Sequence, residues 1–106
     1  MERFENVSLV TKANVYFDGR ITSRTFYTKD GERKTLGIVM PGEYTIEVGD
    51  EERIDVTGGL LEVQTVEDKG GWRKVGPGET VTVPAKTTFT MRTYVVSDYA
   101  CSYIKA

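Results

Sequence analysis

The sequence predicts an all-β chain folded as a sandwich or a jelly-roll barrel. Its 106 residues are enough for one domain. No stretch shows the 3.6-residue hydrophobic period of an amphipathic helix, and short runs of β-branched and aromatic residues alternate with Gly, Pro and Asp instead. These turn-forming residues recur at close intervals, as in barrels and sandwiches of many short strands. Since no linker or internal repeat interrupts the pattern, we expect a single domain over residues 1–106.

The first half of the chain contains six expected strands, most of them ended by a turn signal. Asp18-Gly19 and Asp30-Gly31 are typical hairpin turns, because glycine adopts positive φ without steric cost. Proline and glycine at 41–42, and Gly49, end the next two runs. The expected strands are residues 7–10, 14–17, 21–28, 34–40, 43–48 and 53–56.

The second half follows the same pattern with glycine-rich turns. Glycines at 58–59, 70–71, and 76 and 78 separate the runs, and Pro84 closes one of them. The expected strands are residues 60–66, 72–75, 79–83, 89–96 and 98–104.

The charge balance argues against a nucleic-acid backbone as the main ligand. The net charge is −2, from 16 acidic and 14 basic residues, and no basic run occurs. A small anionic substrate needs only one or two well-placed cations and stays possible. No apolar segment approaches the length of a signal peptide or a membrane span, so we expect a cytoplasmic protein without a membrane partner.

Histidine is absent, and the chain has one cysteine, Cys101. A zinc, copper or iron site of the imidazole type therefore cannot be built within one chain, and neither can a Ser-His-Asp or Cys-His arrangement. We expect no metal. An internal disulfide is also impossible.

Two segments resemble the cupin pattern. In one, five residues separate Gly78 from Pro84, and Phe89 stands where metal cupins carry a histidine ligand. In the other, Glu51 precedes Gly58 by seven positions, as in the first cupin motif, whose two histidines have no counterpart here. The resemblance implies a cupin-type jelly-roll barrel, whereas the metal site of ordinary cupins does not carry over.

A closer resemblance spans nearly the whole chain. The residues that carry it are 13–19, 23–25, 30–31, 34–38, 41–44, Gly58, Leu61, Val63, Trp72, 83–85, Phe89 and 99–104. In this order they resemble the pyrimidine/purine nucleoside phosphorylase family, and the block from Lys34 to Tyr44 is the most specific part. The resemblance implies metal-independent phosphorolysis of diverse nucleosides to free base and (deoxy)ribose 1-phosphate. It also implies a homodimer, with phosphate as co-substrate and no cofactor.

Phosphate binding needs Arg or Lys together with hydroxyl or backbone donors. Lys34 and Thr35 are the first candidates. In an extended strand Lys34 shares a face with the apolar side chains of Leu36, Ile38 and Met40, so it either lines a pocket or lies at a solvated strand end. The alternative is that Lys34 only extends to solvent at the start of the strand.

A second pair of phosphate candidates is Ser23 and Arg24, although an exposed strand arginine is the commoner case. Carboxylates that could bind ribose hydroxyls or assist the leaving base are Glu43 and Glu51. Glu43 alternates with other polar residues, which indicates a solvated face, and Glu51 lies in a charged run that is usually a loop. Tyr44, on the opposite face from Glu43, is the better pocket candidate.

The aromatic residues near the end of the chain could stack on a nucleobase. Tyr99 and Tyr103 share one strand face with Cys101, and Phe89 precedes them. The alternative is that all four belong to the barrel core. For Cys101 we favour the core, because no histidine is available to activate the thiol.

Two other functions stay open from the sequence. One is a non-catalytic cupin module that binds a small ligand or a protein, and the other is a cupin isomerase or sugar-modifying enzyme, which the absence of histidine disfavours. A homodimer is also expected on physical grounds, because a small jelly roll leaves edge strands that pairing would protect.

Overall fold

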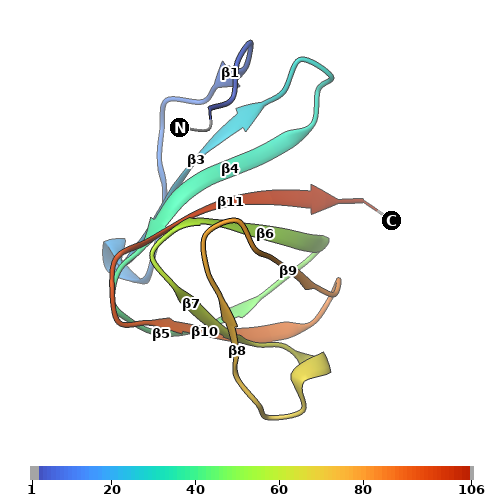
Figure 1. Ribbon diagram of the computed structural model, residues 1–106. Coiled ribbons are helices and arrows are strands. Elements are labelled where there is room, and N and C mark those ends of the chain that lie inside the picture. Colours follow the sequence, from blue (N-terminus) through green and yellow to red (C-terminus); the bar gives the residue numbers. More distant parts are fainter. Residues whose placement is uncertain (1–2, 106) are drawn as a thin grey trace.

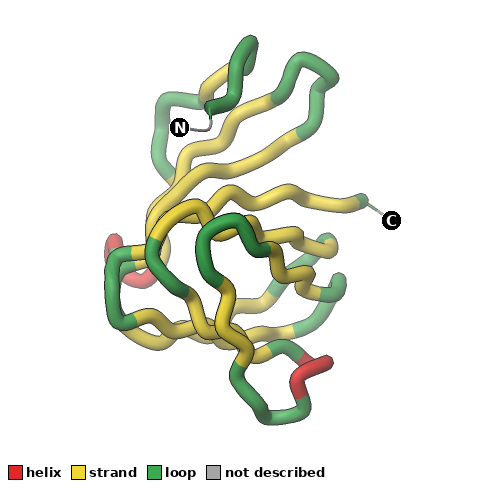
Figure 2. Tube along the Cα trace, viewed as in Figure 1, coloured by secondary structure: helices red, strands yellow, loops and turns green. Residues whose placement is uncertain are grey.

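The computed structural model describes residues 3–105, in which the regular elements are β-strands and two short 3₁₀ helices (Figures 1 and 2). The elements are β1 (Ser8–Leu9), β2 (Asn14–Tyr16), η1 (Phe17–Gly19), β3 (Ile21–Tyr27), β4 (Arg33–Val39), β5 (Gly42–Glu47), β6 (Glu51–Gly58), β7 (Leu61–Gln64), η2 (Val66–Asp68), β8 (Arg73–Val75), β9 (Thr80–Val83), β10 (Thr88–Thr93) and β11 (Ser97–Ile104).

The strands form two antiparallel sheets that face each other (Figure 1). The larger, seven-stranded sheet has the order β1-β3-β4-β11-β6-β9, with β2 also paired to β3. The smaller, four-stranded sheet has the order β5-β10-β7-β8. After β4 the chain passes back and forth between the sheets, so that β11, the last strand, lies between β4 and β6.

The predicted all-β fold is confirmed, and its strands lie in two facing antiparallel sheets. The Cα radius of gyration of 13.3 Å is close to the ~13 Å expected for a compact domain of about 100 residues. The first two residues and the last residue of the predicted domain 1–106 lie outside the described range. Each expected strand overlaps an observed one.

The strand boundaries differ where side chains redirect the backbone. β7 ends at Gln64 because Thr65 caps η2: its backbone N–H donates to Asp68 Oδ2 at 2.8 Å, and its hydroxyl accepts from the Glu67 N–H at 3.2 Å. β6 begins at Glu51, two residues before the expected start, so part of the charged run that was expected to be a loop belongs to a strand.

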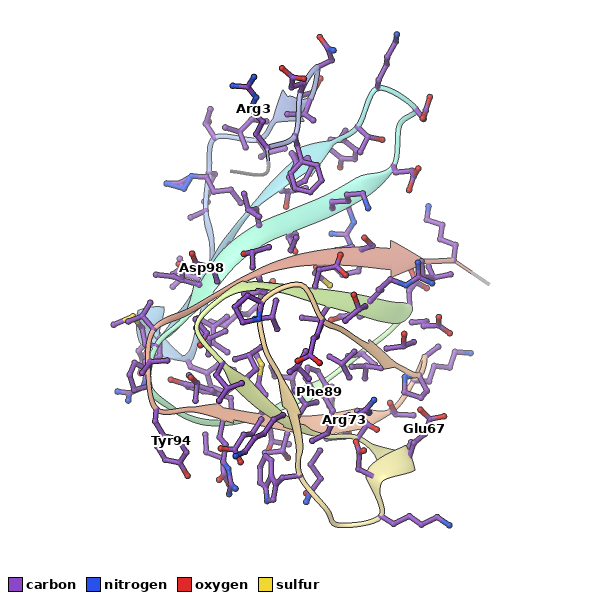
Figure 3. The ribbon with its side chains drawn as sticks, viewed as in Figure 1. Arg3, Glu67, Arg73, Phe89, Tyr94 and Asp98 are labelled. Carbon is purple, nitrogen blue, oxygen red and sulfur yellow. The ribbon has the colours of Figure 1, made fainter. Side chains whose placement is uncertain are left out.

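The core lies between the sheets and consists of the inward-facing residue of each alternating pair. Its members are mainly aliphatic, with two aromatic rings and one thiol: Ile21, Val39, Tyr44, Val48, Ile54, Val56, Leu61, Val63, Val75, Val81, Val83, Phe89, Met91 and Cys101. Phe89 is seen between the two layers in Figure 3. The core fills one part of the space between the sheets and leaves a cavity in the other.

Candidate functional site

The cavity between the sheets has a volume of about 650 Å³. This lies in the range of about 300–1,000 Å³ that is usual for small-molecule sites. Its walls combine apolar and aromatic groups with a few polar and charged ones. The lining residues are Tyr16, Phe17, Ile21, Ser23, Arg33, Thr45, Ile46, Glu47, Glu52, Ile54, Leu61, Thr88, Phe89, Met91, Tyr99, Cys101 and Tyr103.

Three side chains from neighbouring strands form what we call the charged row: Arg33 on β4, Tyr103 on β11 and Glu52 on β6. Tyr103 is directly opposite Glu52 in the β11–β6 ladder. The guanidinium carbon of Arg33 lies 4.0 Å from the centre of the Tyr103 ring, a cation–π contact. Among residues 3–105, no carboxylate lies within ion-pair distance of Arg33. Its guanidinium N–H groups are therefore available to an anion.

Cys101 and Thr35 lie one step deeper, and each contacts the charged row. Cys101 is opposite Thr35 in one ladder, and both side chains are buried. The Cys101 thiol donates to Glu52 Oε1 at 3.5 Å, and the Thr35 and Tyr103 hydroxyls are 3.1 Å apart. These contacts fix the orientation of Glu52 and Tyr103.

Burial favours the neutral form of the acids at this end of the cavity. It raises the pKa of the Glu52 carboxyl, while the Cys101 hydrogen bond and the charge of Arg33 act in the opposite direction. Burial, and then the charge of Glu52, raise the pKa of the Cys101 thiol. Burial also raises the pKa of the Tyr103 phenol. Cys101 and Tyr103 are thus neutral hydrogen-bond donors at physiological pH.

Ser23 and Tyr99 line the cavity further along the same sheet. They flank Gly37, which is opposite Ser23 in the β3–β4 ladder and opposite Tyr99 in the β4–β11 ladder. Asn14 Nδ2 donates to the Ser23 hydroxyl at 3.2 Å. Burial raises the pKa of Tyr99 to about 12. The opposite wall comes from β5 and β10, where Phe89 is paired with Ile46.

Four of the predicted substrate-binding residues line this cavity, namely Ser23, Phe89, Tyr99 and Tyr103. Thr35 does not line it but supports Tyr103. Tyr44 is buried on the inner side, as expected, but its hydroxyl is engaged by backbone: it donates to the carbonyl oxygens of Met40 at 2.7 Å and Pro41 at 3.2 Å. The Tyr44 hydroxyl is therefore not available to a ligand in the cavity, and Tyr44 is not among the cavity-lining residues.

Lys34 lies on the outer face of the larger sheet, where its Nζ donates to the Ser102 hydroxyl at 2.6 Å. Of the two positions considered for its side chain, the pocket-lining one is wrong. The apolar residues that share its face are exposed, Leu36 by 46% and Ile38 by 38%. The inner positions of β4 belong instead to Arg33, Thr35, Gly37 and Val39.

The remaining predicted residues also lie away from the cavity wall. Arg24 is exposed on the outer face, beside a shallow hollow of about 270 Å³ that Leu36 also lines. Glu43 is exposed on β5. Glu51 is half-buried at the start of β6, opposite Ile104, and the cavity carboxylate of this strand is its neighbour Glu52.

Arg33, Glu47 and Glu52 are charged cavity residues that were not predicted from the sequence. Strand alternation contained a signal for Glu52. Glu52 alternates with the apolar Ile54 and Val56, which are buried. Arg33 shares its face with Thr35 and Gly37, which is the less apolar face of β4 and gave no such signal.

Residues 3–105 contain neither a metal-binding cluster nor a membrane-spanning helix. No three or more His, Cys, Asp or Glu side chains lie close enough together to hold a metal ion. In the described part of the chain, no helix has the length and apolar character needed to span a membrane.

Comparisons with known proteins agree with one another. A model of the family described as pyrimidine/purine nucleoside phosphorylase matches residues 11–103. A protein of Chlorobium chlorochromatii named pyrimidine/purine nucleoside phosphorylase is 42% identical over 104 residues, which are 98% of this chain and 99% of that protein.

Solved structures share the fold. A protein of unknown function from Acinetobacter sp. ADP1 is 32% identical, with a TM-score of 0.92 over 96% of this chain and 98% of the other. The EutQ protein of Clostridium difficile has a TM-score of 0.66 at 11% identity, over 78% of this chain and 67% of the other. The second likeness concerns the fold alone.

Proposed function

Because the chain belongs to the pyrimidine/purine nucleoside phosphorylase family, we propose that it cleaves nucleosides with inorganic phosphate in the cavity between its sheets. Phosphorolysis transfers the pentosyl group from the base to phosphate, with build-up of positive charge on the sugar as the C–N bond breaks. The site must therefore hold phosphate close to the anomeric carbon and a nucleobase at a fixed angle to it.

The observation that supports this assignment best is the position of Arg33. It is a permanent cation at the cavity wall, and among residues 3–105 no carboxylate pairs with it. We assign phosphate binding to its guanidinium, with the Tyr103 hydroxyl as a neighbouring donor. Arg33 is exposed, and stacking on the Tyr103 ring favours one orientation of its guanidinium, which lowers the entropy cost of binding the anion.

The nucleoside fits the aromatic part of the same cavity. Phe89 and Tyr99 present ring surfaces to it, and every nucleobase has a face that can stack on a ring. Ser23 and Tyr99 offer hydroxyl groups to the sugar or the base. Because stacking is tolerant of the base, we propose that purine and pyrimidine nucleosides are both substrates.

The predicted phosphate-binding roles of Lys34 and Arg24, and the catalytic roles of Glu43 and Glu51, stay predictions. The side chains of Lys34 and Arg24 are separated from the cavity by the sheet, which is why Arg33 replaces them in this proposal.

The test measures base release from uridine and inosine, with and without phosphate. Arg33→Ala should raise the KM for phosphate about 10- to 100-fold, because a hydrogen bond to a charged group contributes roughly 1.5–3 kcal/mol. Arg53→Ala removes an exposed guanidinium from the outer side of β6 and should leave the KM unchanged.

Three results would count against the proposal. Equal rates with and without phosphate would exclude phosphorolysis, and binding without turnover would favour a non-catalytic cupin module. A phosphate effect of Lys34→Ala or Arg24→Ala, but not of Arg33→Ala, would place the phosphate site on the outer face of the sheet.

Metal independence is part of the same proposal. The chain has no histidine, and Phe89 stands where metal cupins carry a ligand. Activity should therefore be unchanged after dialysis against EDTA, and a loss that Zn²⁺ or Mn²⁺ restores would contradict it.

We further propose that the chain is a cytoplasmic homodimer. Exposed apolar side chains on the outer face of the larger sheet, Leu36 and Ile38 among them, support the dimer. Cell fractionation would test the location.

A further inference from the structure

We propose that Glu52 is the acid that protonates the departing nucleobase, and that Cys101 positions its carboxyl group. This assignment rests on the proposed phosphorolysis and identifies a residue for its most demanding step. A nucleobase that leaves as an anion is a poor leaving group, and a proton delivered to it in the transition state removes that charge.

The position of Glu52 is set by β6. Its side chain shares the inner face of the strand with Ile54 and Val56, and it lines the cavity at one end of the charged row. Glu43 and Glu51 do not line the cavity. Glu47 lines the cavity, but it is exposed to solvent and lies on β5 of the opposite sheet.

One oxygen of Glu52 is held and the other is free. Among residues 3–105, Cys101 is the one side-chain donor to Glu52, and its thiol bonds to Oε1. No buried side-chain oxygen or nitrogen of the described residues lacks a partner, so the unpartnered Oε2 is not fully buried, and Glu52 lines the cavity. An accessible carboxyl oxygen with a fixed orientation can carry a transferable proton.

The surroundings of Glu52 favour the protonated carboxyl without locking it. Burial is the largest effect on its pKa and raises it, whereas the Cys101 hydrogen bond and Arg33 lower it by smaller amounts. The groups that face it are Arg33 from β4 and Cys101 and Tyr103 from β11, with Glu47 across the cavity. Its partner on β9, Val83, is apolar.

The step balances as follows. An oxygen of HPO₄²⁻ forms a bond to C1′, and the C1′–N bond breaks with its electron pair moving to the base. The Glu52 proton transfers to that base, which leaves as a neutral molecule. The carboxylate then takes up the proton of the ester hydroxyl, through water, so that ribose 1-phosphate leaves as a dianion and Glu52 is again protonated.

The experiment compares two leaving groups in wild type and Glu52→Gln. Uridine needs a proton on its base, whereas nicotinamide riboside releases neutral nicotinamide without one. Glu52→Gln should lower kcat/KM for uridine at least about 100-fold, and for nicotinamide riboside less than about threefold. Glu67→Gln, which changes an exposed carboxylate on η2, should alter neither (Figure 3).

The pH dependence of kcat/KM gives a second test, which is valid even if nicotinamide riboside is not a substrate. With uridine, wild-type kcat/KM should fall as the pH rises through the pKa of Glu52, and Glu52→Gln should lack this decline. In Cys101→Ala the decline should move to higher pH, because the thiol hydrogen bond that lowers this pKa is gone. A purely structural role for Cys101 would not move it.

Two results would overturn the assignment: an equal loss for both substrates in Glu52→Gln, or an unchanged uridine rate and pH profile. Wild type that releases no base with phosphate would instead overturn the proposed function itself. Matching melting temperatures of wild type and Glu52→Gln would show that the variant is folded.

Discussion

Arg33 is the permanent charge among the groups that meet at the charged row. Glu52, Cys101 and Tyr103 all have raised pKa values, for each of which burial is the first cause. A guanidinium is protonated at every physiological pH. The end of the cavity is therefore electropositive whenever Glu52 is neutral, which suits a phosphate dianion, and it becomes less so when Glu52 loses its proton.

Tyr99 leads to a prediction about stability at high pH. Its pKa is raised from the ordinary value of about 10 to about 12 by burial. Below pH 10 the phenol is protonated in the folded and the unfolded chain alike. Above it the unfolded chain loses the proton first, so the free energy of unfolding should fall as the pH rises from about 10 to 12.

The measurement is the urea midpoint at several pH values between 8.5 and 12. Tyr99→Phe should show a smaller decline than wild type, and some decline should persist because Tyr103 and Cys101 also have raised pKa values. Identical declines in the two proteins would show that Tyr99 ionises as readily in the folded chain as in the unfolded one.

At the scale of a strand, β4 shows what sequence alternation can and cannot predict. The alternation itself is as expected, with Lys34, Leu36 and Ile38 on one face. The side of the sheet on which this face lies could not be inferred, because the more apolar set is the outer one and the inner set contains Thr35 and a glycine. Only the position of the second sheet decides it.

β6 shows a similar limit, because the position of its first residue decides which of two adjacent glutamates faces inward. Its start was expected two residues later, so Glu51 and Glu52 were both assigned to a loop, where alternation has no meaning. A cupin alignment then favoured Glu51. With the strand begun at Glu51, alternation from the buried Ile54 places Glu52 inside. The element was predictable, whereas its first residue, which decides the site, was not.

Gly37 of β4 gives a prediction at this scale. A Cβ there would overlap the backbone carbonyl oxygen of Thr22 and would lie 2.8 Å from Ser23 Cβ, so no side chain fits between β3 and β4. Gly37→Ala must push the strands apart, and it should lower the free energy of unfolding by about 1–3 kcal/mol or more.

The matched control is Gly49→Ala, since a Cβ at Gly49 meets nothing within 4 Å. Its urea midpoint should stay close to that of wild type. Equal midpoints for the two variants would mean that β3 and β4 can separate at no cost. Because Ser23 lies opposite Gly37, the displaced strand should also raise the KM for nucleosides in Gly37→Ala.

For the whole molecule, the two sheets differ in width. The larger sheet extends past the smaller one on the side of β1 and β3, at the top of Figure 1. There Phe4 packs on Phe26 at a ring distance of 4.9 Å and buries it. The neighbouring part of the outer face has no such cover, and Val15, Leu36, Ile38 and Met40 are exposed by 37–59%. We call these four residues the outer patch.

The outer patch yields the last prediction. Val15 is paired with Thr22, which is paired with Ile38, so apolar side chains of β2 and β4 lie on either side of Thr22 of β3 on the same face. Several exposed apolar side chains on one sheet face are a feature of interfaces. By light scattering, wild type should have twice the chain mass of 11.9 kDa at micromolar concentration. Ile38→Glu should have the mass of one chain, because a carboxylate cannot be buried in the interface without a partner. Val66→Glu alters an exposed valine on η2 and should remain dimeric. A monomeric wild type would contradict the homodimer, whereas a dimeric Ile38→Glu would transfer the contact to an edge strand such as β9, where paired backbones tolerate the charge.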